Sequence, residues 1–260
     1  MAGKGKGLAM ATLITYKVLE DRGDKLKAAA RLACSFWNHH IEPERSIVLH
    51  IDLFWSPLPY IARSYEPETA GGVIHGRIRF NTVYVRKYDA TQLAGTLTHE
   101  IGHTLDFGWD RWLGLFDAAS GQFTADAIAR LPELSAMRVE TDHGPATQYL
   151  HWDEGKHRAE LMTGFENRSE HVLPITVDVM ALLGHKVKTP LTQRTALADL
   201  FSRFQDEPFL FKAEAKRMAS ANVRPDRVLE RVFEQLPARH RPEVRTSLRK
   251  VLKVPGAAGR

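Results

Sequence analysis

Cysteine is nearly absent from this sequence: Cys34 is the only one in 260 residues. No disulfide can therefore form within the chain, which excludes the small secreted domains that depend on several disulfides. Cys34 lies in an apolar helical pattern, so we expect a buried structural thiol. No apolar run approaches the roughly 18 residues of a membrane span, and the sequence therefore predicts a soluble chain without a transmembrane helix.

The N-terminus has no recognisable signal peptide. Two lysines precede a short apolar stretch, but Lys17 interrupts this stretch before it reaches the length of a signal peptide. Internal repeats and low-complexity tracts are absent as well. These absences favour an ordinary globular protein and leave its cellular location open.

Charge is distributed unevenly along the chain. Residues 1–185 carry 19 Lys and Arg against 23 Asp and Glu, whereas residues 186–260 carry 17 against 8. This asymmetry predicts two parts, a domain over 1–187 and a basic, all-helical extension over 188–260. The basic extension is compatible with binding to nucleic acid or an acidic partner, but it contains no recognised nucleic-acid motif.

Hydrophobic periodicity in the first part predicts an α+β domain. Residues 24–40 repeat apolar side chains at helical spacing, and residues 46–55 form a β-branched run typical of a strand. Residues 56–72 are rich in Pro, Ser and Gly, which indicates a loop. Residues 76–86 alternate apolar and polar side chains and predict a second strand.

The most informative motif is H-E-x-x-H, formed by His99, Glu100 and His103. Asp89 and Gln92 resemble a capping box, and apolar residues recur behind them, so the motif falls on a predicted helix. On a helix this spacing puts two imidazoles on one face, where they can bind zinc, and places a glutamate beside them as a base.

A catalytic zinc site needs a third protein ligand, and spacing alone does not identify it. The extended protease motif would have Gly at 106 and His at 109, where this chain has Asp106 and Trp109. Asp110 is close in sequence, and six histidines lie farther along the chain. The downstream histidines are His143, His151, His157, His171, His185 and His240.

A resemblance selects one of them. The stretch LHWDEGKHRAELMTGF, residues 150–165, is similar to the second signature of the leishmanolysin family of metzincin zinc proteases. In that family a His-Trp pair supplies the third zinc ligand, and a following Glu-Leu-Met supplies the methionine of the Met-turn beneath the metal. The resemblance spans about residues 90–187. It implies that His151 is the third ligand and Met162 the Met-turn residue, in a domain with a twisted mixed sheet, two long helices and a Met-turn subdomain.

The chain departs from the family pattern at Asp106, where members usually have glycine. That glycine makes a sharp turn in the left-handed conformation, which aspartate is one of few other residues to tolerate. We therefore expect the turn to survive at Asp106 or to move to Gly108. Glu160 is an alternative ligand, as in thermolysin-like enzymes. The cysteines of many eukaryotic members are missing, which is typical of a bacterial-type version.

Together these features predict a zinc-dependent endopeptidase with one catalytic Zn²⁺ ion and a peptide or protein substrate. Glu100 would be the general base, and an extended substrate would pair with a sheet edge, for which residues 76–81 are the candidate. Two other classes remain open: a non-peptidase zinc hydrolase, and a non-catalytic zinc-stabilised binding module that uses the basic tail.

Overall fold

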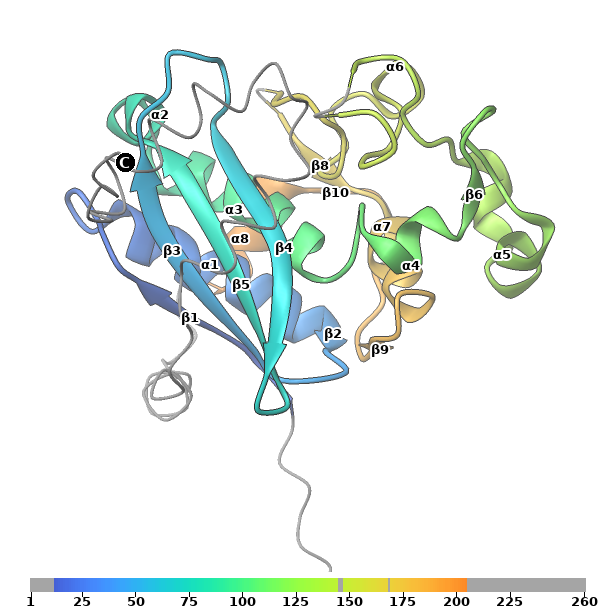
Figure 1. The fold of residues 1–260 in the computed structure, drawn as a ribbon, viewed down its shortest axis with the longest axis horizontal. Coiled ribbons are helices and arrows are strands. Elements are labelled where there is room, and N and C mark those ends of the chain that lie inside the picture. Colours follow the sequence, from blue (N-terminus) through green and yellow to red (C-terminus); the bar gives the residue numbers. More distant parts are fainter. Residues whose placement is uncertain (1–11, 145–146, 168, 205–260) are drawn as a thin grey trace, which may run out of the picture.

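A four-stranded sheet forms the centre of the computed structural model, which describes residues 12–144, 147–167 and 169–204 (Figure 1). The strand order is β1-β3-β5-β4; the first three strands run parallel, and β4 runs antiparallel to β5. The strands are β1 (Ile14–Val18), β3 (Ile47–Phe54), β4 (Ala62–Ala70) and β5 (Val73–Asn81). The protein is thus a mixed α/β structure with an open mixed sheet, compatible with the predicted α+β class.

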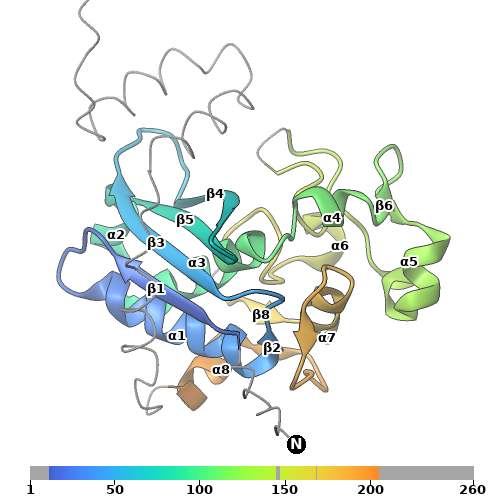
Figure 2. The same ribbon diagram turned by 60° about the horizontal axis from the view of Figure 1, so that its bottom comes forward.

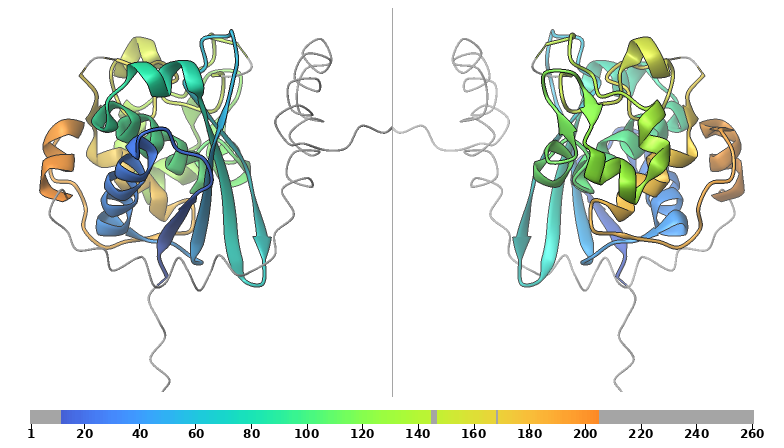
Figure 3. Two further views of the ribbon diagram at one scale, coloured as in Figure 1. Left: turned by 90° about the vertical axis from the view of Figure 1, so that its left-hand side faces the viewer. Right: turned by 90° about the vertical axis from the view of Figure 1, so that its right-hand side faces the viewer.

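Two long helices, α1 (Lys25–His40) and α3 (Ala90–Thr104), cover one face of the sheet (Figure 3). Both were expected from their periodicity. The indole N–H of Trp37 in α1 donates to the Thr98 carbonyl of α3 at 2.9 Å, which fixes the two helices against each other. Cys34 is buried in this layer, so the prediction of a structural thiol is confirmed.

Side chains alternate across the sheet and separate an apolar face from a polar one. The residues of β3 that face the helices are Ile47, Leu49, Ile51 and Leu53. Asp52 points to the opposite face, where its carboxylate pairs with the buried guanidinium groups of Arg77 and Arg79 from β5. The apolar core therefore lies between the sheet and the helices, on the side that carries the candidate site.

The prediction of a loop over residues 56–72 was wrong in its second half, because β4 occupies residues 62–70. The strand lies at the edge of the sheet, with a register shift between Tyr65 and Glu68 that brackets Pro67. An edge strand tolerates proline and polar residues, because only one side of its backbone takes part in the ladder. Composition alone therefore gave the wrong structure for this segment.

The prediction for residues 76–86 also needs two corrections. The strand ends at Asn81, whose side chain accepts a hydrogen bond from the Val83 amide and caps a short helix, α2 (Thr82–Lys87). In addition, β5 lies between β3 and β4, so residues 76–81 cannot form the proposed edge for substrate. Among the described residues, the strand at this edge of the sheet is β4.

Between α3 and residue 173, the described part of the chain forms short elements around an aromatic cluster. Phe107 stacks on Trp112 with ring centroids 3.8 Å apart, and Trp152 packs edge-on against both. The elements are α4 (Asp110–Leu113), β6 (Phe116–Asp117), β7 (Gln122–Phe123), α5 (Ala125–Arg130), η1 (Pro132–Ala136), α6 (Glu154–His157) and β8 (His171–Val172). Aromatic packing rather than backbone ladders fixes this half of the molecule.

Two short helices follow, α7 (Pro174–Asp178) and η2 (Val179–Ala181), and Gly184 comes after them with φ 93°. Beyond it, the short strands β9 (Lys186–Val187) and β10 (Thr195–Ala196) pair with β2 (Ile41–Glu42) and β8. The last described helix, α8 (Leu197–Phe204), packs beside α1 (Figure 2).

The division into 1–187 and 188–260 stays a prediction. Within its second part, Leu200, Phe201 and Phe204 are buried in the same core as α1, and residues 205–260 lie outside the described part of the chain. Among the described residues, no helix combines the length and the apolar character needed to cross a membrane.

Candidate metal centre

Helix α3 presents His99 and His103 one turn apart on the same face. The predicted capping box starts this helix: the Asp89 side chain accepts from the Gln92 amide at 2.8 Å, and the Gln92 side chain accepts from the Asp89 amide at 3.0 Å. Such reciprocal caps satisfy the free amides of the first turn. The motif therefore sits on a helix with a defined start, and its side chains point from the core layer toward the second half of the molecule.

The chain returns to this helix at His151, 48 residues after His103. The three Nε2 atoms form a nearly equilateral triangle, with edges of 3.0 Å for His99–His103 and 3.2 Å for the two pairs that include His151. Zinc–imidazole bonds of about 2.0–2.1 Å in a tetrahedron place nitrogens roughly 3.3–3.4 Å apart. These three histidines could therefore hold a metal ion, and the donor set fits zinc.

The other ring nitrogen of each histidine is hydrogen-bonded to a backbone carbonyl. The Nδ1 partners are Leu161 O at 2.7 Å for His99, Phe107 O at 2.7 Å for His103 and Thr147 O at 2.9 Å for His151. A carbonyl only accepts, so each Nδ1 must carry the proton, and each Nε2 has its lone pair directed at the centre of the triangle. This arrangement is the usual support for metal-binding imidazoles.

Burial keeps these imidazoles neutral, which is the form that binds metals. Desolvation lowers the pKa of His99, and it lowers the pKa of His151 to about 3. The pKa of His103 falls well below its usual value because of burial and the neighbouring His99 and His151.

Glu100 lies beside this triangle with only 7% of its surface exposed. Burial raises the pKa of its carboxyl group to about 8, while the backbone amide of Ser64 and the charge of Arg63 act in the opposite direction. Ser64 also approaches α3 through its hydroxyl, 3.5 Å from that of Thr104. The edge strand β4 therefore runs directly past the candidate base.

Met162 is fully buried and packs against the motif helix at Gly102. A Cβ atom at Gly102 would lie 2.7 Å from the Met162 sulfur. The amide of Trp152 donates to the Met162 carbonyl at 3.0 Å and links this turn to the residue after His151. Met162 therefore lies against the helix that carries His99 and His103, and its role as a Met-turn residue stays a prediction.

We expect Gly102→Ala to destabilise the fold by about 1–3 kcal/mol, because the added methyl group forces the packed Met162 side chain to move. Chemical denaturation measures the change. The matched control is Gly114→Ala, where the nearest atom to the new methyl group is 3.5 Å away and φ is −78°. Equal stability of the two variants would contradict the close packing of Met162 on the helix.

Glu160 does not join the three histidines. Its carboxylate accepts from the Met162 amide and the Thr176 hydroxyl, both at 2.6 Å, and from the Leu173 amide at 3.3 Å. Burial raises its pKa to about 7 against the effect of these bonds. Glu160 therefore fixes the turn that contains Met162.

The remaining candidates in the described part of the chain also lie elsewhere, and His240 lies outside the described residues. Asp106 faces Arg111, and His185 bonds the Leu105 carbonyl at 3.0 Å. Among the described residues, the only group with metal-ligand geometry is the triangle of His99, His103 and His151. The expected turn survives at Asp106, with φ 75°, and Gly108 is left-handed as well, with φ 91°.

Sequence reasoning missed the backbone carbonyls that orient the histidines, because no residue type marks them. One signal was available at Gly164, where a Cβ atom would lie 2.1 Å from Thr147 Cγ2 and 3.3 Å from His151 Nδ1. A glycine in that turn is needed for the close approach of the loop that carries the third histidine.

Comparison with known proteins adds no relative: no protein-family model matches the chain, and no curated protein matches it.

Proposed function

We propose that this protein is a zinc-dependent endopeptidase with a metzincin-like catalytic domain similar to that of the leishmanolysin family. The observation that carries the proposal is the convergence of His99, His103 and His151 on one point, with Glu100 beside them. A purely structural site has no use for a carboxylate at that position. A bound zinc ion supplies Lewis acidity, which lowers the pKa of a water molecule and polarises a carbonyl group.

The residues of the chain divide the remaining work. The three imidazoles would hold the ion, and the backbone carbonyls bonded to their Nδ1 atoms stop the rings from rotating. The Glu100 carboxylate accepts a proton from the attacking water and then donates it to the departing amine nitrogen of the peptide. Met162 packs against the motif helix and Glu160 fixes the turn that contains Met162, and neither takes part in proton transfer.

The substrate in this proposal is an extended peptide that pairs with β4. This strand is a sheet edge among the described residues, and the backbone amide of Ser64 hydrogen-bonds to the Glu100 carboxyl group. A peptide that adds to β4 therefore passes the candidate base. Addition of a strand to a free edge supplies affinity through backbone hydrogen bonds and leaves specificity to the side chains. The edge lies at β4, one strand beyond the segment that the sequence suggested.

Hydrolysis of casein and of fluorogenic peptides, with and without a chelator, tests the proposal. The expected result is cleavage inside the peptide that a chelator abolishes and one equivalent of zinc restores. Cleavage that persists after complete removal of metal would contradict it. Zinc-dependent hydrolysis of small esters or amides without any peptide cleavage would instead favour a non-peptidase hydrolase.

A further inference from the structure

The turn after α3 has the hydrogen bonds of a Schellman motif. The Phe107 amide donates to the Gly102 carbonyl at 3.1 Å, and the Asp106 amide donates to the His103 carbonyl at 3.0 Å. Asp106 occupies the left-handed position of this motif with φ 75°. Glycine is the usual residue there, because a side chain in this conformation is strained.

This turn sets the orientation of one metal-ligand candidate. The carbonyl of Phe107, the residue after Asp106, accepts from His103 Nδ1 at 2.7 Å. If the turn opened, that carbonyl would move and the His103 ring would lose the bond that fixes it. The conformation of Asp106 is therefore coupled to the direction of the His103 Nε2 lone pair.

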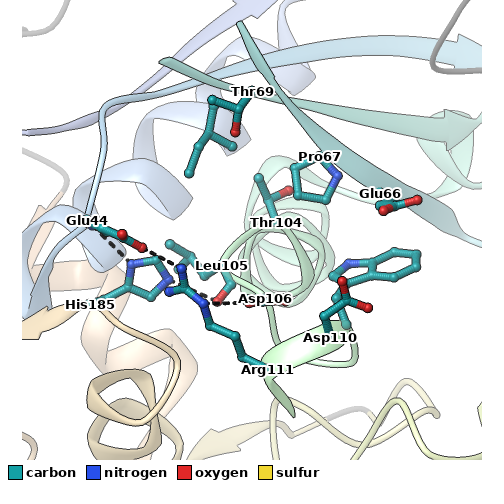
Figure 4. Close-up of a pocket in the computed structure, with 12 residues that line it drawn as sticks. Glu44, Glu66, Pro67, Thr69, Thr104, Leu105, Asp106, Asp110, Arg111 and His185 are labelled. Atoms are coloured by element: carbon teal, nitrogen blue, oxygen red, sulfur yellow. Dashed lines mark hydrogen bonds and ion pairs between the residues drawn. The ribbon is translucent and has the colours of Figure 1, made fainter. Parts of the chain in front are cut away.

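The side chain of Arg111 lies next to that of Asp106 and forms an ion pair with it (Figure 4). Its Nε lies 3.5 Å from Asp106 Oδ2, and its two terminal nitrogens donate to Glu44 Oε2 at 2.7 Å and to the Leu183 carbonyl at 2.5 Å. The guanidinium lies so close to Gly184 that a Cβ atom there would be 2.0 Å from Nη1. Two hydrogen bonds, to Glu44 and to the Leu183 carbonyl, thus hold Arg111 independently of Asp106 and the metal centre.

Asp106 and Arg111 lie among carboxylate groups. The pair lies in the wall of a cavity of about 240 Å³ that is also lined by Glu44, Glu66 and Asp110. Among the described residues lining this cavity, Arg111 is the only one with a permanent positive charge. Without it, Asp106 would face neighbouring carboxylates, which would favour a rearranged turn.

We propose that Asp106 and Arg111 act as a positioning pair that replaces glycine at this turn and thereby orients His103 toward a bound zinc ion. This inference rests on the proposed function, which supplies the zinc ion that His103 would bind. In glycine-containing turns of this kind no clamp is required. The effect of Arg111 on zinc affinity should therefore depend on the residue at position 106. Arg111 should matter for zinc binding only while that position carries aspartate.

Four forms of the full chain test this dependence: the parent, Asp106→Gly, Arg111→Ala and the double variant. Competition against a chelator gives the dissociation constant for zinc. We expect Arg111→Ala to weaken zinc binding by about 10-fold in the parent, in the range known for groups that support metal ligands. In the Asp106→Gly background the same change should alter it less than about twofold.

Three further experiments separate positioning from general stability. Arg130→Ala removes another partly exposed arginine with a carboxylate partner, Asp126, and should leave zinc affinity unchanged. Denaturation of the zinc-free forms shows how far each variant destabilises the fold. Rescue by Arg111→Lys, which restores a cation next to Asp106, should recover part of the lost affinity.

Equal losses of affinity in both backgrounds, or no loss in either, would overturn the positioning role while leaving the zinc site intact. A parent chain that binds no zinc would overturn the proposed function together with this inference. These failures are distinguishable, because the second is visible in the parent alone.

Discussion

Glu100→Gln should lower kcat for peptide hydrolysis by about 10²- to 10⁴-fold while the chain still binds one zinc ion. Glutamine has the shape of glutamate but cannot accept a proton from water or pass it to the leaving amine, and general acid–base catalysis contributes a factor of this size. The three histidines bond to carbonyls of Leu161, Phe107 and Thr147, and none of them depends on Glu100 for its orientation. Steady-state hydrolysis of a fluorogenic peptide measures kcat, and metal analysis of the purified variant measures its zinc content.

The control for this experiment is Glu133→Gln, which removes a carboxylate from an exposed position in η1. Its activity and zinc content should match those of the parent. If Glu100→Gln hydrolysed peptides at the parental rate with zinc bound, Glu100 would not be the base and the proposed mechanism would be wrong.

His151→Ala should weaken zinc binding by more than about 100-fold. The change removes one of three protein ligands, and its effect should exceed the 10- to 100-fold typical of losing a group that only supports a ligand. The remaining pair, His99 and His103, lies on one helix and cannot surround the ion. Chelator competition measures the affinity, and peptide hydrolysis should be lost at the same time.

A matched control is His157→Ala, six residues farther along the same segment. The Nε2 atom of His157 accepts a hydrogen bond from the Arg138 amide at 3.2 Å, so its lone pair is already occupied by the backbone. Its replacement should leave zinc affinity within about twofold of the parent. Parental zinc affinity in His151→Ala would mean that another group completes the site, contrary to the geometry of Glu160 and Asp106.

Local signals predicted the motif helix well. The capping box at Asp89 and Gln92 and the apolar spacing behind it lie in α3 and its N-cap, so sequence alone was enough to place His99 and His103 on one face. The burial of Cys34 followed from the same kind of pattern. Helical periodicity is read within a few turns, and neighbouring residues therefore determine it.

The site was harder to predict where it depends on tertiary contacts. His151 lies 48 residues after His103, and only the resemblance around Met162 selected it from six downstream histidines. The carbonyls that orient the rings come from three separate turns and leave no trace in residue type. Glu160 was open as a ligand, because sequence does not show which way a buried carboxylate points.

The sheet edge shows the same limit. Residues 62–70 contain polar residues and Pro67, which a central strand would exclude but an edge strand accepts. The alternating stretch at 76–81 had the stronger strand pattern, and it belongs to β5, which is flanked by β3 and β4. The pattern therefore indicated a strand correctly, and its position in the sheet was the part that required the fold.

A crystal structure of the zinc-loaded protein, with anomalous data collected at the zinc absorption edge, tests the central claim most directly. We predict one anomalous peak within the triangle of His99, His103 and His151, bonded to the three Nε2 atoms at about 2.0–2.1 Å. A peak bound to Glu160 or to Asp106, or no zinc between the three histidines, would contradict it.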